Sequence, residues 1–323
     1  MDKRLLISLF LIFTTWLQAS DYVPRDYVWT TQSKNSCGSM PCGGHDIGMN
    51  VWVEKGDILF YIAQSGWFDE NNTLLKAGRW RIHLQGKPLD SKDFQQRLCL
   101  DDGAIYIKGG GVNVRIWADV EEPVVFVTIE SPKKRRATLS YESWRYKDRP
   151  LTKAECQQCS YKWVLPKDTY TLADSITPIV TTPPHGEAGR GSLLSFCHHN
   201  RPITVFDYTV SREHIDDVKA SVFNPIGSLS LRGEMSAPGF HYVGTTDGVY
   251  ASTDYRSWNF RHDNLTESTI AIQLSASSPL MDKKMKGCVS ANTSQSRSTR
   301  WWHNYWQRSW IVSDSGNDSL QAM

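Results

Sequence analysis

The chain has 323 residues, of which 22% are charged, with a formal net charge of +2 and seven cysteines. This length and composition are typical of a globular chain with one large domain or two smaller ones. The near-neutral charge gives no electrostatic reason to expect nucleic acid or an anionic membrane as a partner.

The first twenty residues fit a secretory signal peptide. Lys3 and Arg4 precede an apolar run at residues 5–17, and the small residues Ala19 and Ser20 follow it. The run is too short for a membrane-spanning helix, and no later stretch is apolar enough to be one. We therefore expect residues 1–20 to be removed on export, a secreted or periplasmic protein, and no membrane association after signal removal.

Residues 36–48, SCGSMPCGGHDIG, form the most informative stretch of the chain. Their glycines and proline predict a loop that can take positive φ angles and approach a ligand closely, before a strand at residues 51–54. His45 and Asp46 are the polar groups that such a loop would present, so they are candidate ligand-binding residues. The alternative is that Asp46 caps its own loop and His45 lies on the surface.

The rest of the chain indicates strand after strand. Residues 58–62 and 137–144 are expected to be strands, and apolar and polar residues alternate at residues 79–84, 104–107, 112–118 and 124–130, with turns about every ten residues. The basic cluster at residues 133–136 is expected to be a solvated hairpin end. Further strands are expected at 193–200, 203–210, 228–232, 240–243, 248–252, 256–261 and 268–275, with one mid-chain helix at 211–219. The pattern predicts an all-β fold, a large antiparallel β-super-sandwich over residues 21–285.

The end of the chain predicts a short aromatic helix in a linker, residues 286–323. From a cap at Ser298 or Thr299, the period of a helix places Trp302, Tyr305 and Trp306 on one face. This helix either folds back onto the sandwich or begins a further domain. We favour the second, because the polar tail at 312–323 cannot cover so much aromatic surface. A helical domain is then the expected partner of Trp301, Trp302, Tyr305 and Trp306.

Several of these segments carry a resemblance: residues 43–54, 56–62, 65–72, 224–227, 232–234 and 301–311. They resemble the N-terminal β-sandwich of a family of exported proteins catalogued as a domain of unknown function, which itself resembles the family 95 α-L-fucosidase-type glycoside hydrolases. The resemblance implies that the tryptophan-rich segment leads into an (α/α)6 barrel that supplies the catalytic acid and base. The chain stops before such a barrel, so it is expected to be a truncated, non-catalytic module that is inactive alone.

Two other functions stay open at this stage. One is a free-standing carbohydrate-binding protein, with Trp67, Trp80 or Trp258 as stacking platforms for sugar rings. The other is an enzyme with an unrecognised site. Asp69 and Glu70 are a poor acid and base pair for hydrolysis, because adjacent residues of an extended segment point to opposite faces. The segment 68–72 is instead expected to be a polar loop that contacts a sugar or a neighbouring domain, with an ordinary turn as the alternative.

Two adjacent histidines, His198 and His199, lie on a predicted strand. Their side chains diverge and no acidic or cysteine partner stands at ligand spacing, so we expect no metal site, no cofactor and one buried, hydrogen-bonded core histidine. The candidate ligand-binding residues are therefore His45, Asp46, Trp67, Asp69, Glu70, Asn71 and His199.

Overall fold

The structure, a computed structural model, describes residues 26–153, 155–159, 169–179, 193–278, 281–282 and 289–308. The predicted signal peptide and residues 309–323 lie outside these ranges. Among the residues described, no helix has both the length and the apolar character needed to cross a membrane.

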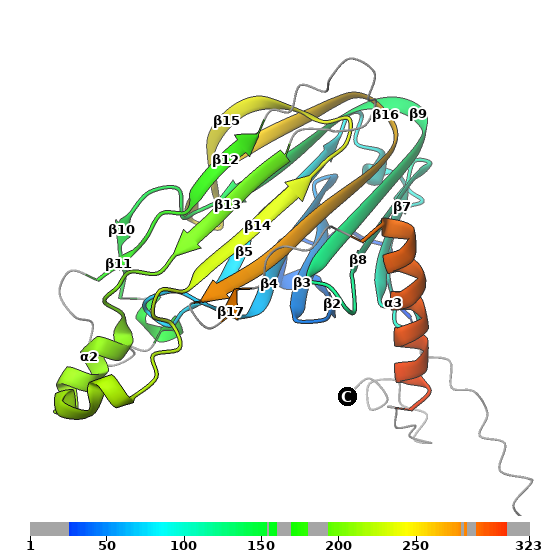
Figure 1. The fold of residues 1–323 in the computed structure, drawn as a ribbon. Helices are drawn as coiled ribbons and strands as arrows, with labels where there is room; N and C mark the ends of the chain where they lie inside the picture. The colour runs from blue at the N-terminus through cyan, green and yellow to red at the C-terminus, as the bar shows by residue number, and fades with distance from the viewer. Residues whose placement is uncertain are drawn as a thin grey trace, which may run out of the picture.

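The all-β prediction is confirmed: the chain is mostly antiparallel strand, with few helices (Figure 1). One continuous sheet folds into two layers because two long strands, β9 (Val124–Ser143) and β16 (Thr253–Ser278), take part in both. In the first layer, residues 124–130 of β9 pair with residues 267–273 of β16. In the second layer, residues 137–143 of β9 pair with residues 256–262 of β16.

The remaining strands extend each layer on either side of this shared pair. The first layer continues from β9 through β8 (Val112–Ala118), β7 (Ala104–Gly109), β6 (Gln95–Cys99) and β1 (Tyr27–Trp29), and from β16 through β14 (Ser230–Ser236), β13 (Leu193–His199) and β12 (Ser175–Ile179). The short strand β17 (Met281–Asp282) pairs with the end of β16. The second layer continues through β5 (Leu74–Leu84), β4 (Asp57–Phe68), β3 (Ile47–Glu54) and β2 (Met40–Gly44), and through β15 (His241–Tyr250). A small separate ladder joins β10 (Arg149–Pro150) and β11 (Tyr170–Thr171).

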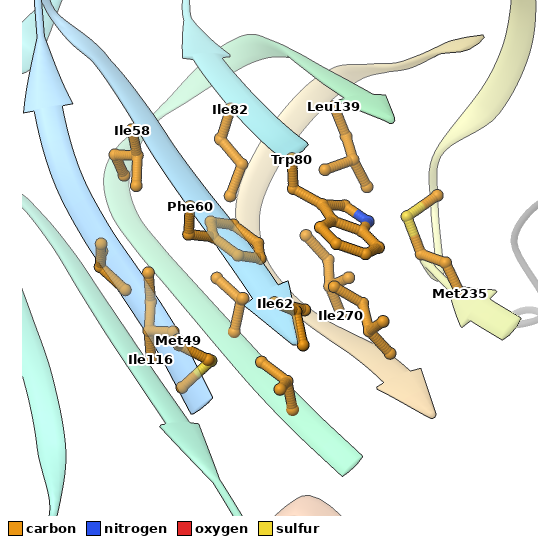
Figure 2. Close-up of a cluster of buried hydrophobic side chains, with 14 of the residues drawn as sticks. Met49, Ile58, Phe60, Ile62, Trp80, Ile82, Ile116, Leu139, Met235 and Ile270 are labelled. Atoms are coloured by element: carbon orange, nitrogen blue, oxygen red, sulfur yellow. The ribbon is translucent and has the colours of Figure 1, made fainter. Parts of the chain in front are cut away.

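The core lies between the two layers. On β5, Trp80 and Ile82 face inward and are fully buried, so the residues between and before them face outward, as the two-residue period of a strand requires. Trp80 stacks on Phe60 of the same layer, with ring centroids 5.7 Å apart, and meets Phe196 of the other layer at 6.0 Å. Figure 2 shows this apolar cluster, which holds the two layers together.

The basic cluster at residues 133–136 is not a hairpin end, as we expected. Strand β9 continues through it, and the cluster lies where β9 passes from one layer to the other, with the register of β16 shifted opposite. Lys133, Lys134 and Arg136 are exposed, so the expectation of a solvated cluster is correct. The chain bends here rather than reversing, because both halves of β9 pair with the same long strand.

The mid-chain helix begins earlier than predicted. Helix α2 (Val205–Arg212) covers residues expected to be a strand, and only a 3-10 helix, η4 (Asp216–Ser221), lies where the helix was expected. The reason is a capping box: the Thr204 hydroxyl accepts from the Phe206 backbone and the Asp207 carboxylate accepts from the Thr204 backbone. The other short 3-10 helices are η1 (Ser36–Gly38), η2 (Pro88–Asp90) and η3 (Glu155–Gln158).

The aromatic helix, α3 (Ala291–Trp306), also begins earlier than predicted, because Ser290 provides its N-cap. It lies beside β7 and β8 (Figure 1). The Trp117 indole donates to the Ser294 hydroxyl at 3.0 Å, and Arg297 donates through Nε to the buried Asp119 carboxylate at 2.8 Å. The first turns of α3 therefore dock on the sandwich through polar contacts at β8 and the residue after it.

The aromatic face of α3 is only partly uncovered. Trp302 lies against Gly103, where a side chain would collide with the indole ring. Trp301 is 45% exposed and stacks on Tyr305, with centroids 5.4 Å apart. Trp302 therefore folds back onto the sandwich, which is the alternative that we did not favour. Among the Trp and Tyr residues of α3, Trp301 is the exposed one.

Candidate functional site

His45 and Asp46 form the tight turn of a hairpin, not an open loop. Strands β2 and β3 flank them, and His45 takes a positive φ of 51°. The His45 Nδ1 lies 2.6 Å from Asp46 Oδ1, and Gln64 of β4 donates to Asp46 Oδ2 at 2.8 Å. The Asp46 carboxylate thus ties the turn to the neighbouring strand, and the two residues do not line the cavity described below.

The tryptophans proposed as stacking platforms are part of the core. Trp67 is 2% exposed, Trp80 is fully buried and Trp258 is 8% exposed. A buried ring cannot offer its face to a sugar, so this part of the prediction is wrong. Trp67 instead packs in the main apolar cluster between the layers.

The segment 69–71 forms the turn between β4 and β5. The Asp69 Oδ1 accepts from the backbone N–H groups of Asn71 at 2.9 Å and Thr73 at 2.7 Å. The Asn71 amide donates to the Tyr170 carbonyl at 3.0 Å. This is the turn that we considered as the alternative to a sugar-contacting loop. Burial raises the pKa of Asp69 above its ordinary value, although the two backbone donors oppose the shift.

Glu70 belongs to a buried ionic network. It lies 3.4 Å from His198 Nε2, whose Nδ1 lies 2.9 Å from Asp174, and Arg145 donates to the same Asp174 oxygen at 2.9 Å. Burial alone would lower the pKa of His198, but its hydrogen bonds to Asp174 and Glu70 outweigh burial and raise the pKa to about 9. The imidazole is therefore charged at neutral pH, and the network joins the β4–β5 turn to β13.

His199 points to the other side of β13 and is exposed. Its Nδ1 lies 2.8 Å from the Ser230 hydroxyl and its Nε2 lies 3.1 Å from the Cys197 sulfur. The expectation of one buried, hydrogen-bonded histidine is confirmed for His198. His199, the one that we selected as a ligand-binding residue, stays outside both the network and the cavity.

A cavity of about 620 Å³ lies over the outward face of the second layer. This volume is within the range of small-molecule sites, ~300–1,000 Å³. The β4–β5 connection, the segment after β9 and the tip of the β15–β16 hairpin surround it. Five aromatic side chains line it: Tyr61, Trp144, Tyr146, Tyr250 and Tyr255.

Arg79 is the central polar residue of this cavity. It stands directly opposite Tyr61 on β4 and Glu142 on β9, so the three share one row on the outward face. The side chain is 3% exposed; Nε pairs with Glu142 and Nη1 donates to the Tyr61 hydroxyl at 3.3 Å. Its guanidinium carbon lies 3.9 Å from the Tyr250 ring centroid and 4.9 Å from that of Tyr255. These cation–π contacts and the ion pair fix the guanidinium at one position in the cavity.

The cavity also contains the acidic side chains of Asp69, Glu155 and Asp254, of which the first two are engaged by other protein groups. Glu155 accepts hydrogen bonds from the two terminal nitrogens of Arg149, Nη1 and Nη2. The hydrogen bonds from Arg149, helped by those from Thr152, hold the pKa of Glu155 at about 2. Among the described residues, no group of three or more His, Cys, Asp or Glu side chains is placed to hold a metal ion.

The sequence analysis placed Asp69 in a candidate site but missed the aromatic residues and Arg79. One signal was available, because the alternation of β4 and β5 puts Tyr61 and Arg79 on the faces opposite to Phe60 and Trp80. The contribution of Tyr250 and Tyr255 depends on pairing between distant strands, which no local pattern contains.

The comparisons with known proteins match this chain to a domain family of unknown function. The family described as "Domain of unknown function (DUF5703)" matches residues 28–311. No curated protein matches the chain. One solved structure, a putative kojibiose phosphorylase from human microbiome, has a TM-score of 0.40 and 10% identity over 94% of this chain. The match covers 40% of that chain.

Proposed function

We infer a binding function for this chain, which belongs to the DUF5703 family, and we propose that its ligand is a carbohydrate held in the aromatic cavity. The observation that carries the proposal is the gathering of Tyr61, Trp144, Tyr250 and Tyr255 around the fixed guanidinium of Arg79. The proposed role is that of a non-catalytic β-sandwich module.

The chemistry of the lining suits a sugar ring. The C–H faces of a pyranose pack on aromatic rings, while its hydroxyl groups need hydrogen-bond partners fixed in place. Trp144 meets Tyr61 edge to face at 6.1 Å, which leaves an aromatic corner beside the Arg79 donors. The half-buried rings of Tyr61 and Trp144 remain in contact with solvent, in contrast to Trp67 and Trp80.

The carboxylates of the cavity support binding rather than hydrolysis. Glycoside hydrolysis requires one carboxyl group that donates a proton and a second that acts as base or nucleophile. Glu155 is held ionised by Arg149, and one oxygen of Asp69 is occupied by the backbone of its own turn. Neither is free to exchange roles with the other.

We further propose that the module belongs to an exported glycoside-hydrolase-like protein, of the α-L-fucosidase type that the sequence resembles. A helical domain would then contact α3, where Trp301 stacks on Tyr305 and is 45% exposed. An aromatic patch of this kind is typical of a contact surface between domains.

The test is a binding and turnover screen on the purified chain. Oligosaccharides are titrated by calorimetry against the unmodified chain, the Trp144→Ala variant and the Trp301→Ala variant. We expect Trp144→Ala to weaken binding by about tenfold or more, as removal of a contacting aromatic does, and Trp301→Ala to leave it unchanged. Absence of binding to any saccharide, or hydrolysis that is lost in Asp69→Asn, would overturn the proposal.

A further inference from the structure

We propose that the saccharide bound in this cavity carries an anionic substituent, either a carboxylate or a sulfate ester, which lies beside Tyr61 between Arg79 and Lys76. This inference rests on the proposed function, because it names the class of sugar that the same cavity takes.

The charge of the cavity lining is the first observation. Its basic side chains are Lys76, Arg79, Arg145, Lys147 and Arg149, whereas its acidic ones are Asp69, Glu155 and Asp254. Arg149 pairs with Glu155, and Arg145 pairs with Asp174. Lys76 and Lys147 form no ion pair with any residue that the structure describes. Arg79 likewise pairs with Glu142. Lys76 and Lys147 are therefore the two lining cations that no ion pair among the described residues neutralises.

A buried donor without a partner is the second observation. The Nη2 group of Arg79 has no hydrogen-bond partner within the described chain, although the side chain is 3% exposed. The Nε and Nη1 groups of the same guanidinium are satisfied by Glu142 and the Tyr61 hydroxyl. A buried, unsatisfied charged donor is unfavourable. An acceptor supplied by a ligand would remove that cost.

The two cations lie around one ring. The Lys76 Nζ lies 4.6 Å from the Tyr61 ring centroid, and the Arg79 guanidinium carbon lies 5.9 Å from the same centroid. No ion pair among the described residues holds Lys76 there, and desolvation lowers the pKa of its amine. An anion between these groups would gain charge-assisted hydrogen bonds from both, and these are stronger than bonds between neutral groups.

A neutral hydroxyl could accept from Arg79 but would leave the charge of Lys76 uncompensated. The aromatic rings argue in turn against a bare inorganic anion, because such an ion makes no use of them. A sugar ring with an acidic substituent uses both parts of the lining.

The test compares three trisaccharides that differ only at C6: a neutral hexose oligomer, its uronic acid and its 6-sulfate. Each is titrated by calorimetry at low and at high salt. We expect an anionic form to bind about tenfold more tightly than the neutral one, as a hydrogen bond to a charged group permits, with the difference reduced by salt. The uronic acid and sulfate arms distinguish the two sources of charge.

Two variants locate the effect. Lys76→Met removes the amine while it retains most of the aliphatic chain, and is expected to abolish most of the preference for the anionic sugar. Lys108→Met, an exposed lysine on β7 of the first layer, is the matched control and should change nothing. Arg79→Lys keeps the charge beside Glu142 but removes the free Nη2 group. It is used only if its circular dichroism is that of the unmodified chain, and Lys76→Met carries the test otherwise.

The outcomes separate the inference from the proposed function. Equal affinity for the neutral and anionic sugars, or a preference that Lys76→Met retains, would overturn the inference and leave carbohydrate binding intact. Binding of acetate or sulfate ions without binding of any saccharide would overturn both. A preference that is lost in Lys76→Met and kept in Lys108→Met supports both.

Discussion

The guanidinium of Arg79 lies 3.9 Å from the ring centroid of Tyr250, although the two residues belong to β5 and to the far end of β15. The Tyr250 hydroxyl in turn donates to Glu54 at 2.9 Å. The tip of the β15–β16 hairpin is thus anchored over the outward face of the second layer. This contact closes one side of the cavity.

The ion pair beneath the cavity is expected to be essential for stability. Glu142 is 2% exposed and accepts from both Arg79 and Arg81. Glu142→Gln leaves two guanidinium groups without their shared carboxylate, so we expect a loss of about 3–5 kcal/mol in the free energy of unfolding, as for other buried pairs that lose one partner. Urea denaturation measures it. The control, Asp247→Asn, breaks the exposed pair with Arg256 and should have little effect.

The network around His198 predicts a stability that depends on pH. The pKa of His198 is about 9 in the folded chain and has an ordinary value of 6.5. Because the folded-state pKa is raised, the stabilisation is fully present below pH 6.5 and is lost as the pH rises towards 9. It amounts to about 3 kcal/mol at most, from 1.36 kcal/mol for each pKa unit. Urea unfolding at pH 6 and pH 9 measures this loss.

Two variants separate His198 from other groups that titrate in the same range. Burial raises the pKa of the Cys42 thiol to about 12, so thiols also destabilise the fold at alkaline pH. His198→Gln should remove only the histidine part of the pH dependence, whereas His199→Gln should retain the dependence of the unmodified chain. An unchanged slope in His198→Gln would contradict the assignment.

These two histidines show why the sequence predicted the fold better than the site. Alternation predicts that His198 and His199 lie on opposite faces, and the structure agrees. Which of the two faces is buried depends on the strands that pair with β13, and adjacent residues carry no information about that. The sequence analysis therefore expected one buried histidine but selected the exposed one, His199, for the site.

Local patterns also failed where a cap competes with alternation. Residues 203–210 contain the Ile, Val, Phe, Thr and Tyr side chains that are typical of strands, yet residues 205–210 lie in α2. The capping box of Thr204 and Asp207 is readable in the sequence and would have predicted the helix start. The assembly of the cavity has no such signal, since Arg79, Trp144 and Tyr250 meet only through the long-range order of β5, β9, β16 and β15.

The contact between Gly103 and Trp302 is expected to hold α3 on the first layer. An added Cβ at Gly103 would lie 2.0 Å from the Trp302 ring, and its φ of 64° is already unfavourable for other residues. Gly103→Ala should therefore displace the indole and accelerate amide hydrogen exchange in residues 291–306. Gly66→Ala is the matched control, because Gly66 has a φ of 84° and no atom near its added Cβ. Equal exchange in the two variants would show that Trp302 does not anchor the helix.

Two substitutions of Asp69 distinguish a structural role of its carboxylate from a catalytic role. Its Oδ1 accepts from two backbone N–H groups of the β4–β5 turn, and Asp69→Asn keeps an acceptor at that position. Because burial raises the pKa of Asp69, its ionised form is less stable in the folded chain than in the unfolded chain, and the neutral amide removes this cost. We expect Asp69→Asn to unfold in urea at a midpoint no lower than the unmodified chain, and Asp69→Ala to lose about 1–3 kcal/mol, since it leaves buried donors unsatisfied. Sugar affinity should survive Asp69→Asn. A stable Asp69→Asn variant that has lost a measurable glycosidase activity would instead make this carboxylate a catalytic group and remove the case for a binding module.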